Sequence, residues 1–346
     1  MNRIYQITFV IFIAILALWQ LPWGYRFVFK KHTQTTLPFM LFSPITHEFS
    51  YNEKDDQNNL IGKDLAGRTY TSNELDSVLP LFYYRQLADR HALPDTIAGE
   101  AMPINKIKKE RFIFRSSPDD INGPITPLYM LLESEPKRLD FSFPTDFFRC
   151  TNQGLEFVDM KTNKIKKAKS EHFTKALKAM GCEFPIIKLH SNPSVRKAYD
   201  NGYLLVDSQH QLFQLKMTHG EADCQALILP NGVEANQVFI TEYASRKSLG
   251  FVTDMNNKMY LIDAETSAAH AIDIPGFDPT VQDIMIIGNP LIWTVRIQDS
   301  MSTAYYGLDA HDYHLYKKKV YPNKQNSFIG LHFTSWKDGY VRTRWN

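Results

Sequence analysis

The chain has 346 residues, of which 44% are hydrophobic, so it can build a large core as one repeat domain or as two ordinary domains. Its 39 lysines and arginines nearly balance 37 aspartates and glutamates, so no net field recruits nucleic acid or another polyanion. Three scattered cysteines, Cys150, Cys182 and Cys224, exclude a disulfide framework and a compact thiolate metal site.

The chain begins with an apolar stretch at residues 7–18, interrupted only by Thr8. Flanking apolar residues extend it to about 18 residues, near the lower limit for crossing a bilayer. No small-x-small cleavage site follows it, and Trp19, Trp23 and Tyr25 are typical of an interfacial aromatic belt. We therefore expect a retained transmembrane anchor at residues 1–23, with membrane lipid as its partner.

The orientation of this anchor rests on two opposing signals. Arg26, Lys30 and Lys31 outnumber Arg3 and the terminal amine, and the positive-inside rule alone would keep the body in the cytosol. A basic start followed at once by a single apolar run is, however, the layout of an uncleaved export signal. We expect a single-pass protein of the bacterial inner membrane with a periplasmic body.

A polar tether is expected at residues 24–36, and a soluble domain at residues 37–346. Within this domain, strand pairs separated by a short turn recur. Three of them carry a turn aspartate, at Asp207, Asp254 and Asp299, spaced by 47 and 45 residues. The strand pair 60–64 and 69–71, with Asp64 at its turn, is another copy, and weaker copies are placed at 112–131, 152–158 and 333–341.

A period in the forties made of short strands is typical of radially repeated four-stranded sheets. The sequence therefore predicts a mainly β fold, a β-propeller-like domain of six or seven blades. The alternative is an irregular pair of β-sandwich domains. Inserted helices are expected at 71–90, split or kinked by Pro80, and at 170–180, ended by Gly181, with a short third helix between Pro193 and residue 200.

Two polar patches are candidate binding sites. Tyr84 and Arg85 belong to the first helix, whose apolar face is expected to contain Phe82 and Tyr83. The second patch is a long loop of the kind that carries recognition in repeat scaffolds, and its candidate residues are Arg115, Asp119, Asp120 and Asn122.

A weaker candidate is a metal site at His311, Asp312 and His314, because imidazoles and carboxylates are ligands for divalent metals. Only a turn could bring both histidines to one ion, and a polar turn without metal is the favoured interpretation. The turn aspartates lack the spacing of a calcium loop and are interpreted as turn-forming residues. No cofactor-binding motif is present.

Four blocks, at residues 76–87, 114–122, 132–134 and 192–204, together with the N-terminal span, carry a family resemblance. The chain resembles an uncharacterised bacterial family of single-span membrane-anchored proteins, a domain of unknown function associated with neighbouring ABC-transporter genes. The resemblance implies an envelope location and a role beside a membrane transporter. It implies no catalytic residue and no cofactor.

The sequence contains no nucleophile elbow, phosphate loop or metalloprotease motif. We therefore expect a periplasm-facing binding or scaffold protein that is accessory to a membrane transporter complex and more a binder than an enzyme. The alternative is an envelope hydrolase or lyase on the same scaffold, which requires convergent carboxylates brought together by folding.

Overall fold

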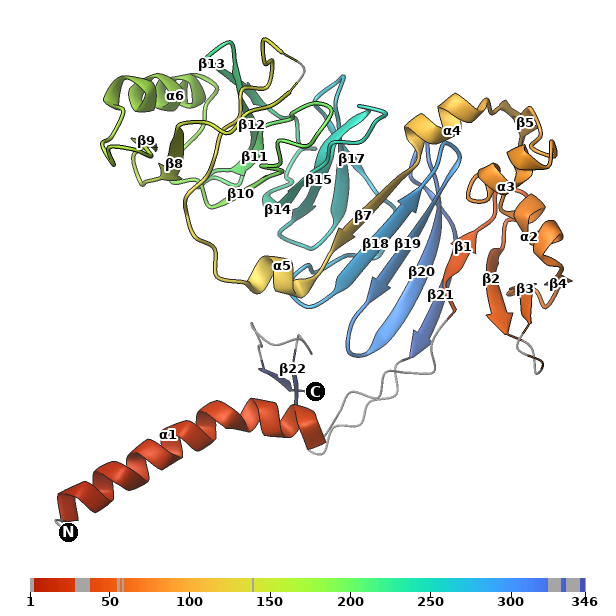
Figure 1. The fold of residues 1–346 in the computed structure, drawn as a ribbon, viewed down its shortest axis with the longest axis horizontal. Helices are drawn as coiled ribbons and strands as arrows, with labels where there is room; N and C mark the ends of the chain where they lie inside the picture. Colours follow the sequence, from red (N-terminus) through yellow and green to blue (C-terminus); the bar gives the residue numbers. More distant parts are fainter. Residues whose placement is uncertain are drawn as a thin grey trace.

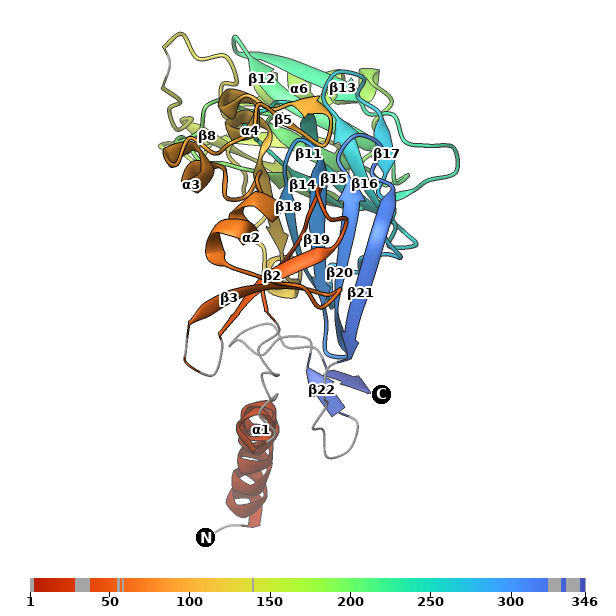
Figure 2. The same ribbon diagram turned by 90° about the vertical axis from the view of Figure 1, so that its right-hand side faces the viewer.

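The computed structural model describes residues 3–28, 38–54, 57, 59–138, 140–322, 331–333 and 343–345. The N-terminal helix α1 (Arg3–Val28) stands apart from the β-rich body (Figure 1, Figure 2). Its window Arg3–Leu21 has 19 residues, a mean hydropathy of 2.1 and 0% burial. The helix is therefore long and apolar enough to span a membrane. It continues to Val28, so the first part of the tether expected at 24–36 is helical, and residues 29–36 lie outside the described residues.

Four antiparallel sheets form most of the body. The first sheet contains β1 (Met40–Phe42), β2 (Phe49–Lys54), β3 (Leu60–Asp64) and β4 (Thr69–Tyr70). The second sheet contains β10 (Lys188–Ser191), β11 (Tyr203–Val206), β12 (Leu212–Thr218) and β13 (Glu221–Ala226). The third sheet contains β14 (Ala235–Ile240), β15 (Ser248–Asp254), β16 (Met259–Asp263) and β17 (Ala269–Ala271). In each, the strands lie side by side in chain order.

The last sheet contains β18 (Asp283–Gly288), β19 (Ile292–Gln298), β20 (Ser302–Asp309) and β21 (Leu315–Pro322). A fifth strand, β7 (Phe112–Ser116), pairs with β18 from a distant part of the chain. Three two-stranded sheets are smaller: β5 (Thr96–Ile97) with β6 (Glu100–Ala101), β8 (Asp146–Cys150) with β9 (Leu155–Asp159), and β22 (Leu331–Phe333) with β23 (Thr343–Trp345).

Five short helices lie between the strands: α2 (Ser72–Val78), α3 (Tyr84–Asp89), α4 (Ile104–Glu110), α5 (Pro118–Asn122) and α6 (Lys167–Ala179). The predicted helix at 71–90 is split as expected, with α2 ending before Pro80. Thr71 caps α2 through a capping box with Glu74, and Gly181 beyond α6 has the left-handed φ of 90°. The third predicted helix is wrong: residues 193–200 form a loop held by side-chain hydrogen bonds of Lys197.

The predicted repeat is confirmed by the turn aspartates. Asp207 lies between β11 and β12, Asp254 is the last residue of β15, and Asp299 lies between β19 and β20, so each marks the end of the second consecutive strand of its sheet. Asp64 differs, because it is the last residue of the third strand of the first sheet. The earliest hairpin is therefore a repeat unit shifted by one strand.

The sheets pack against one another in an arc, with β8, β9 and α6 at one end and β1–β4 at the other (Figure 1). Each junction is apolar, because a four-stranded sheet has two faces to bury. Leu204 and Val206 of the second sheet pack with Val238 and Ile240 of the third. The third and last sheets share a larger core, which includes Phe114, Phe239, Phe251, Ile286, Trp293 and Val295.

The first and last sheets also pack together, although they lie at opposite ends of the sequence. The backbone N–H of Phe42 donates to Thr294 Oγ1 at 2.9 Å, and the ring of Phe49 contacts that of Tyr305. At Gly307 a Cβ would lie 2.3 Å from the Phe42 ring, so this position requires glycine. The junction thus joins segments about 250 residues apart.

The fold is mainly β and propeller-like in the order of its sheets, but the predicted six or seven blades are not found in the described residues. These form four sheets of four or five strands, with β8 and β9 as a smaller unit. Residues 112–131 are not a repeat copy, because β7 pairs with β18. The copy at 152–158 includes β9, and residues 334–341 of the last expected copy lie outside the described residues.

Candidate binding cavity and polar clusters

A cavity of about 440 Å³ lies where β1, the segment 79–83 and α3 meet β7, β18 and β19 of the last sheet. Its volume falls within the range of small-molecule sites. Most of its lining is apolar, and the buried apolar residues include Leu41, Phe42, Leu79 and Leu81. Phe82 and Ile113 are exposed and lie at its mouth. The cavity is therefore an apolar depression that opens to solvent.

Two arginines, Arg85 of α3 and Arg111 between α4 and β7, line the same cavity. Their guanidinium carbons lie 5.9 Å and 5.3 Å from the centre of the Tyr84 ring, and Arg85 Nε donates to the Tyr84 hydroxyl at 3.2 Å. Neither arginine forms an ion pair with any carboxylate among the described residues. The mouth of the cavity is consequently positive.

The helix face around this cavity differs from the predicted one. Tyr84, expected at the surface, is only 1% exposed, whereas Phe82, expected in the core, is 42% exposed. The reason is that the chain breaks after α2 and restarts at Tyr84, so the periodicity does not continue across Pro80. Of the two predicted residues, Arg85 remains an accessible candidate, and Tyr84 orients it.

The second predicted patch lies at the other end of β7. Arg115 is an exposed residue of β7, while Asp119, Asp120 and Asn122 belong to α5. Asp120 Oδ2 accepts hydrogen bonds from the Ser117 backbone and hydroxyl, both at 2.8 Å, and Asn122 Nδ2 donates to Thr280 O. Two of these side chains are therefore used to cap α5 and to fix its loop, and binding at this patch stays a prediction.

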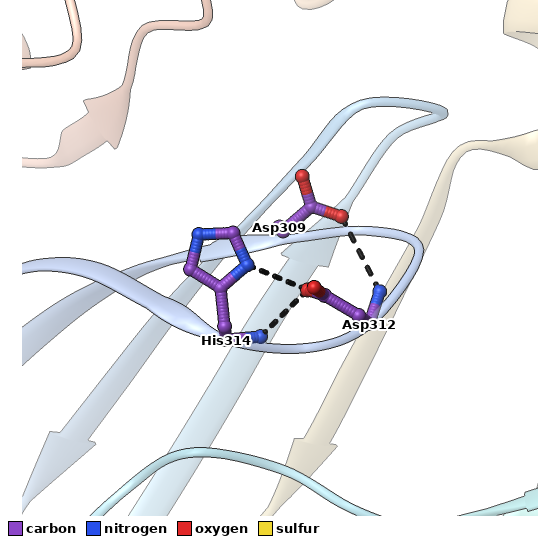
Figure 3. Close-up of side chains that lie close together, drawn as sticks. All are labelled: Asp309, Asp312 and His314. Carbon is purple, nitrogen blue, oxygen red and sulfur yellow. Dashed lines mark hydrogen bonds and ion pairs between the residues drawn. The ribbon is translucent and has the colours of Figure 1, made fainter.

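The weak metal candidate is a turn between β20 and β21 (Figure 3). Asp309, Asp312 and His314 bring their ligand atoms within 4.8 Å of one another, but Asp312 and His314 are exposed. His311 instead lies near Asp309 and Glu100. Turn hydrogen bonds occupy the cluster: Asp312 Oδ1 lies 2.6 Å from His314 Nδ1, and Asp309 Oδ1 accepts from Asp312 N at 3.3 Å (Figure 3). Asp309 Oδ1 also accepts from His311 N.

These hydrogen bonds also shift the pKa values of the carboxyl groups in the turn. Burial raises the pKa of Asp309, but hydrogen bonds from His311 N and the Tyr316 hydroxyl more than offset it and hold that pKa below its ordinary value. Hydrogen bonds from the His314 backbone and ring lower the pKa of Asp312. Both carboxylates are thus stabilised as turn acceptors.

Divalent zinc is expected to leave the stability of the protein unchanged, because the carboxylates at this turn already accept hydrogen bonds. Thermal unfolding of the full chain with and without millimolar zinc would measure this. The comparison variant is His314→Ala, which removes the imidazole. A zinc-dependent rise in melting temperature that disappears in His314→Ala would contradict the expectation and indicate a metal site.

The turn aspartates of the repeat are confirmed as turn-forming residues. Asp207 Oδ1 accepts from the backbone N–H groups of Gln209 and Gln211, and Asp207 Oδ2 accepts from Glu183 N at 2.8 Å. Asp254 accepts equivalent backbone hydrogen bonds and a further one from the Tyr260 hydroxyl at 3.1 Å. These carboxylates stabilise hairpins by accepting hydrogen bonds from the backbone N–H groups of their turns.

A buried ionic network was missed by the sequence reasoning. Lys197 Nζ binds Asp200, and it also contacts Glu242 Oε1 at 2.8 Å and Asn192 O at 2.6 Å. The side chains of Lys197, Asp200 and Glu242 are 5%, 3% and 4% exposed. Burial raises the pKa of Glu242, and Lys197 partly offsets this. The network joins the loop between β10 and β11 to the loop after β14.

Every charged group in this network has further polar partners. Ser134 Oγ donates to Asp200 Oδ2 at 2.6 Å, while Asn201 N and Asn192 Nδ2 donate to Glu242 at 2.9 and 2.7 Å. Asp200 and Glu242 converge, as the enzyme alternative requires, but neither lines the described cavity. In the sequence, the distinctive block at 192–204 could have indicated this network, because it contains Lys197 and Asp200. No sequence pattern marks their partner Glu242.

Comparison with known proteins adds a family and two partial structural similarities. A family model described as Domain of unknown function (DUF4857) matches residues 39–308. No curated protein shows a significant match. A solved structure titled "Structure of Dos1 propeller" is similar at 14% identity and a TM-score of 0.30, over 53% of this chain and 46% of that one.

A second similar structure is the dihydro-heme d1 dehydrogenase NirN in complex with DHE. Its identity is 10% and its TM-score 0.30, with 70% of this chain and 60% of that chain covered. The chain thus spans less than two-thirds of the length of either structure.

Proposed function

This chain belongs to the family described as Domain of unknown function (DUF4857), and we propose that it is a membrane-anchored binding or scaffold protein. The observation that carries this proposal is α1, a helix of membrane-spanning length whose apolar window is 0% buried. An apolar surface of this extent is unfavourable in water, so lipid is its natural surrounding. The body would then act close to a bilayer.

The proposed location is the bacterial inner membrane, with the body in the periplasm and in contact with a membrane transporter. The layout of the N-terminus supports export, because a basic start is followed directly by the apolar run. An arc of small sheets supports a binding role, since such repeats expose long loop surfaces on a rigid frame.

The enzyme alternative finds no support at the convergent carboxylates. Asp200 and Glu242 both bind Lys197 and are almost inaccessible to solvent. A hydrolase needs its carboxylates free to reach a substrate. The described cavity offers arginines and apolar surface instead, which favours binding over hydrolysis.

Reporter fusions to the C-terminus test the orientation. A phosphatase that is active only after export is expected to be active in this fusion, and a fluorescent protein that matures only in the cytosol is expected to be dark. The opposite pair of results would place the body in the cytosol, in agreement with the basic residues Arg26, Lys30 and Lys31.

Cross-linking in intact membranes, followed by detergent extraction and capture of the full chain, tests the partner. Transporter subunits are expected among the captured proteins. The control is the same membrane preparation lacking the tagged chain. Repeated capture of no membrane protein above this control would count against the scaffold role.

A further inference from the structure

We propose that the cavity between the first and last sheets binds an amphiphilic anion, a molecule with one anionic group and a compact apolar body. This inference rests on the proposed binding role and names its ligand class. The ligand's anionic group would lie between Arg85 and Arg111, and its apolar part would fill the depression behind them.

The charge of the site argues for an anion. Arg85 and Arg111 both line this cavity, and both lie within 6 Å of the ring centre of the buried Tyr84. Neighbouring cations repel unless an anion compensates them. Among the described residues, Glu110 pairs with Lys247 at 2.9 Å, Asp76 pairs with Arg90 at 2.7 Å, and Asp89 of α3 forms no ion pair with Arg85.

Because both cations are arginines, the chemical class of the anion can be specified further. Guanidinium groups donate paired hydrogen bonds that match carboxylate and phosphate oxygens, and they are less strongly hydrated than ammonium groups. Arg85 uses its Nε toward Tyr84, which leaves its two terminal nitrogens for a ligand. A phosphate or carboxylate is therefore the complementary group.

The walls of the site argue for an apolar body. Leu41, Phe42, Leu79 and Leu81 are buried and form part of the lining. A free phosphate bound by the arginines would leave these apolar walls of the 440 Å³ cavity in contact with water. An apolar ligand group would release that water, a favourable change.

Isothermal titration calorimetry tests this with the full chain in phosphatidylcholine nanodiscs and empty nanodiscs as the blank. The probe is 1-naphthyl phosphate, with inorganic phosphate and 2-naphthol as its two halves. The whole probe is expected to bind at least tenfold more tightly than either half. Arg85→Ala and Arg111→Ala should each weaken binding about tenfold, the effect of losing a charge-assisted hydrogen bond.

The matched control is Arg149→Ala, which removes the same charge from β8 at the opposite end of the arc and should bind like the wild type. Because an alanine variant could fold poorly, Arg85→Lys combined with Arg111→Lys provides a second test. This double lysine variant keeps both charges. It is expected to bind the probe more tightly than the double alanine variant, which combines Arg85→Ala with Arg111→Ala. Melting curves of each variant accompany the titrations.

A second arm uses nanodiscs containing phosphatidylglycerol at physiological ionic strength, which screens the surface field. If the natural occupant is a lipid headgroup, wild-type affinity for the probe falls to that of the double alanine variant. If it is a free molecule, wild-type affinity stays the same. Both results support the ligand class and distinguish its source.

Equal binding of the probe by wild type and the double alanine variant, or equally tight binding of 2-naphthol, would overturn the inference. Neither result bears on orientation or on capture of a membrane partner, which test the proposed function through separate measurements. The failure of one proposal is thus distinguishable from the failure of the other.

Discussion

Replacing Lys197 by methionine is expected to lower the free energy of unfolding by about 3–5 kcal/mol. The substitution keeps the length of the side chain but leaves Asp200 and Glu242 as buried carboxylates without their shared cation. Breaking a buried ion pair from one side costs this much, because the remaining charge has neither water nor a partner. Denaturant unfolding of the detergent-solubilised chain, followed by tryptophan fluorescence, would measure the loss.

Two further variants show whether the buried charges cause this loss. Lys216→Met removes a lysine whose partner Asp223 is 46% exposed, and it should cost at most about 1 kcal/mol. Combining Lys197→Met with Asp200→Asn and Glu242→Gln removes the uncompensated charges and should recover most of the stability. If Lys197→Met costs no more than Lys216→Met, the network does not stabilise the fold in this way.

The cost of Lys197→Met should also depend on pH. Burial raises the pKa of Glu242, so the folded state favours its protonated form. Such a group contributes stability that is fully present below the ordinary pKa of glutamate and is lost as pH rises through the raised value. Lys197 lowers the pKa of Glu242, and removing it raises that pKa further. The substitution should therefore cost less at pH 5 than at pH 8.

The second large effect is expected at the turn between β11 and β12, where Asp207→Ala should cost about 3–5 kcal/mol. Asp207 is 0% exposed and accepts hydrogen bonds from the N–H groups of Glu183, Gln209 and Gln211. Alanine leaves all three N–H groups without this acceptor, and a hydrogen bond to a charged group contributes about 1.5–3 kcal/mol. The donors belong to exposed residues, so water offsets part of the loss. Thermal or denaturant unfolding would show the loss.

The graded variant Asp207→Asn tests the assignment of this cost. Its side-chain oxygen can still accept from Gln209 and Gln211, so only the bond from Glu183 is lost and about 1–2 kcal/mol is expected. Asp263→Ala is the control, because Asp263 makes the same kind of turn at a half-exposed position where water can replace it. Equal losses for Asp207→Ala and Asp263→Ala would show that burial is not decisive.

The repeat could be predicted because one residue marks it. An aspartate after the second strand binds the N–H groups of its own turn, and that requirement is local in sequence. The same turn chemistry explains why the first hairpin was assigned to the wrong position in the repeat. Asp64, Asp263 and Asp309 make similar turns after the third strand, so an aspartate alone does not identify which turn of a sheet it occupies.

Other features could not be predicted because they depend on contacts between distant segments. β7 joins the last sheet across a separation of more than 160 residues, and no local pattern distinguishes it from the start of a blade. The cavity combines Arg85, Arg111 and residues of two sheets. Of its lining residues, the sequence indicated only Arg85 as a binding candidate. Glu242 has no neighbouring motif and becomes recognisable only beside Lys197.

The contact between Phe42 and Thr294 has a consequence for biosynthesis. The first sheet leaves the ribosome about 250 residues before its partner. The aromatic side chains of β1 and β2 therefore stay unpacked until β19 and β20 have been synthesised. Such late pairing delays completion of the core and exposes apolar surface in the nascent chain. A chain that stops before β18 would therefore keep an exposed apolar surface on its N-terminal sheet and need a chaperone to prevent aggregation.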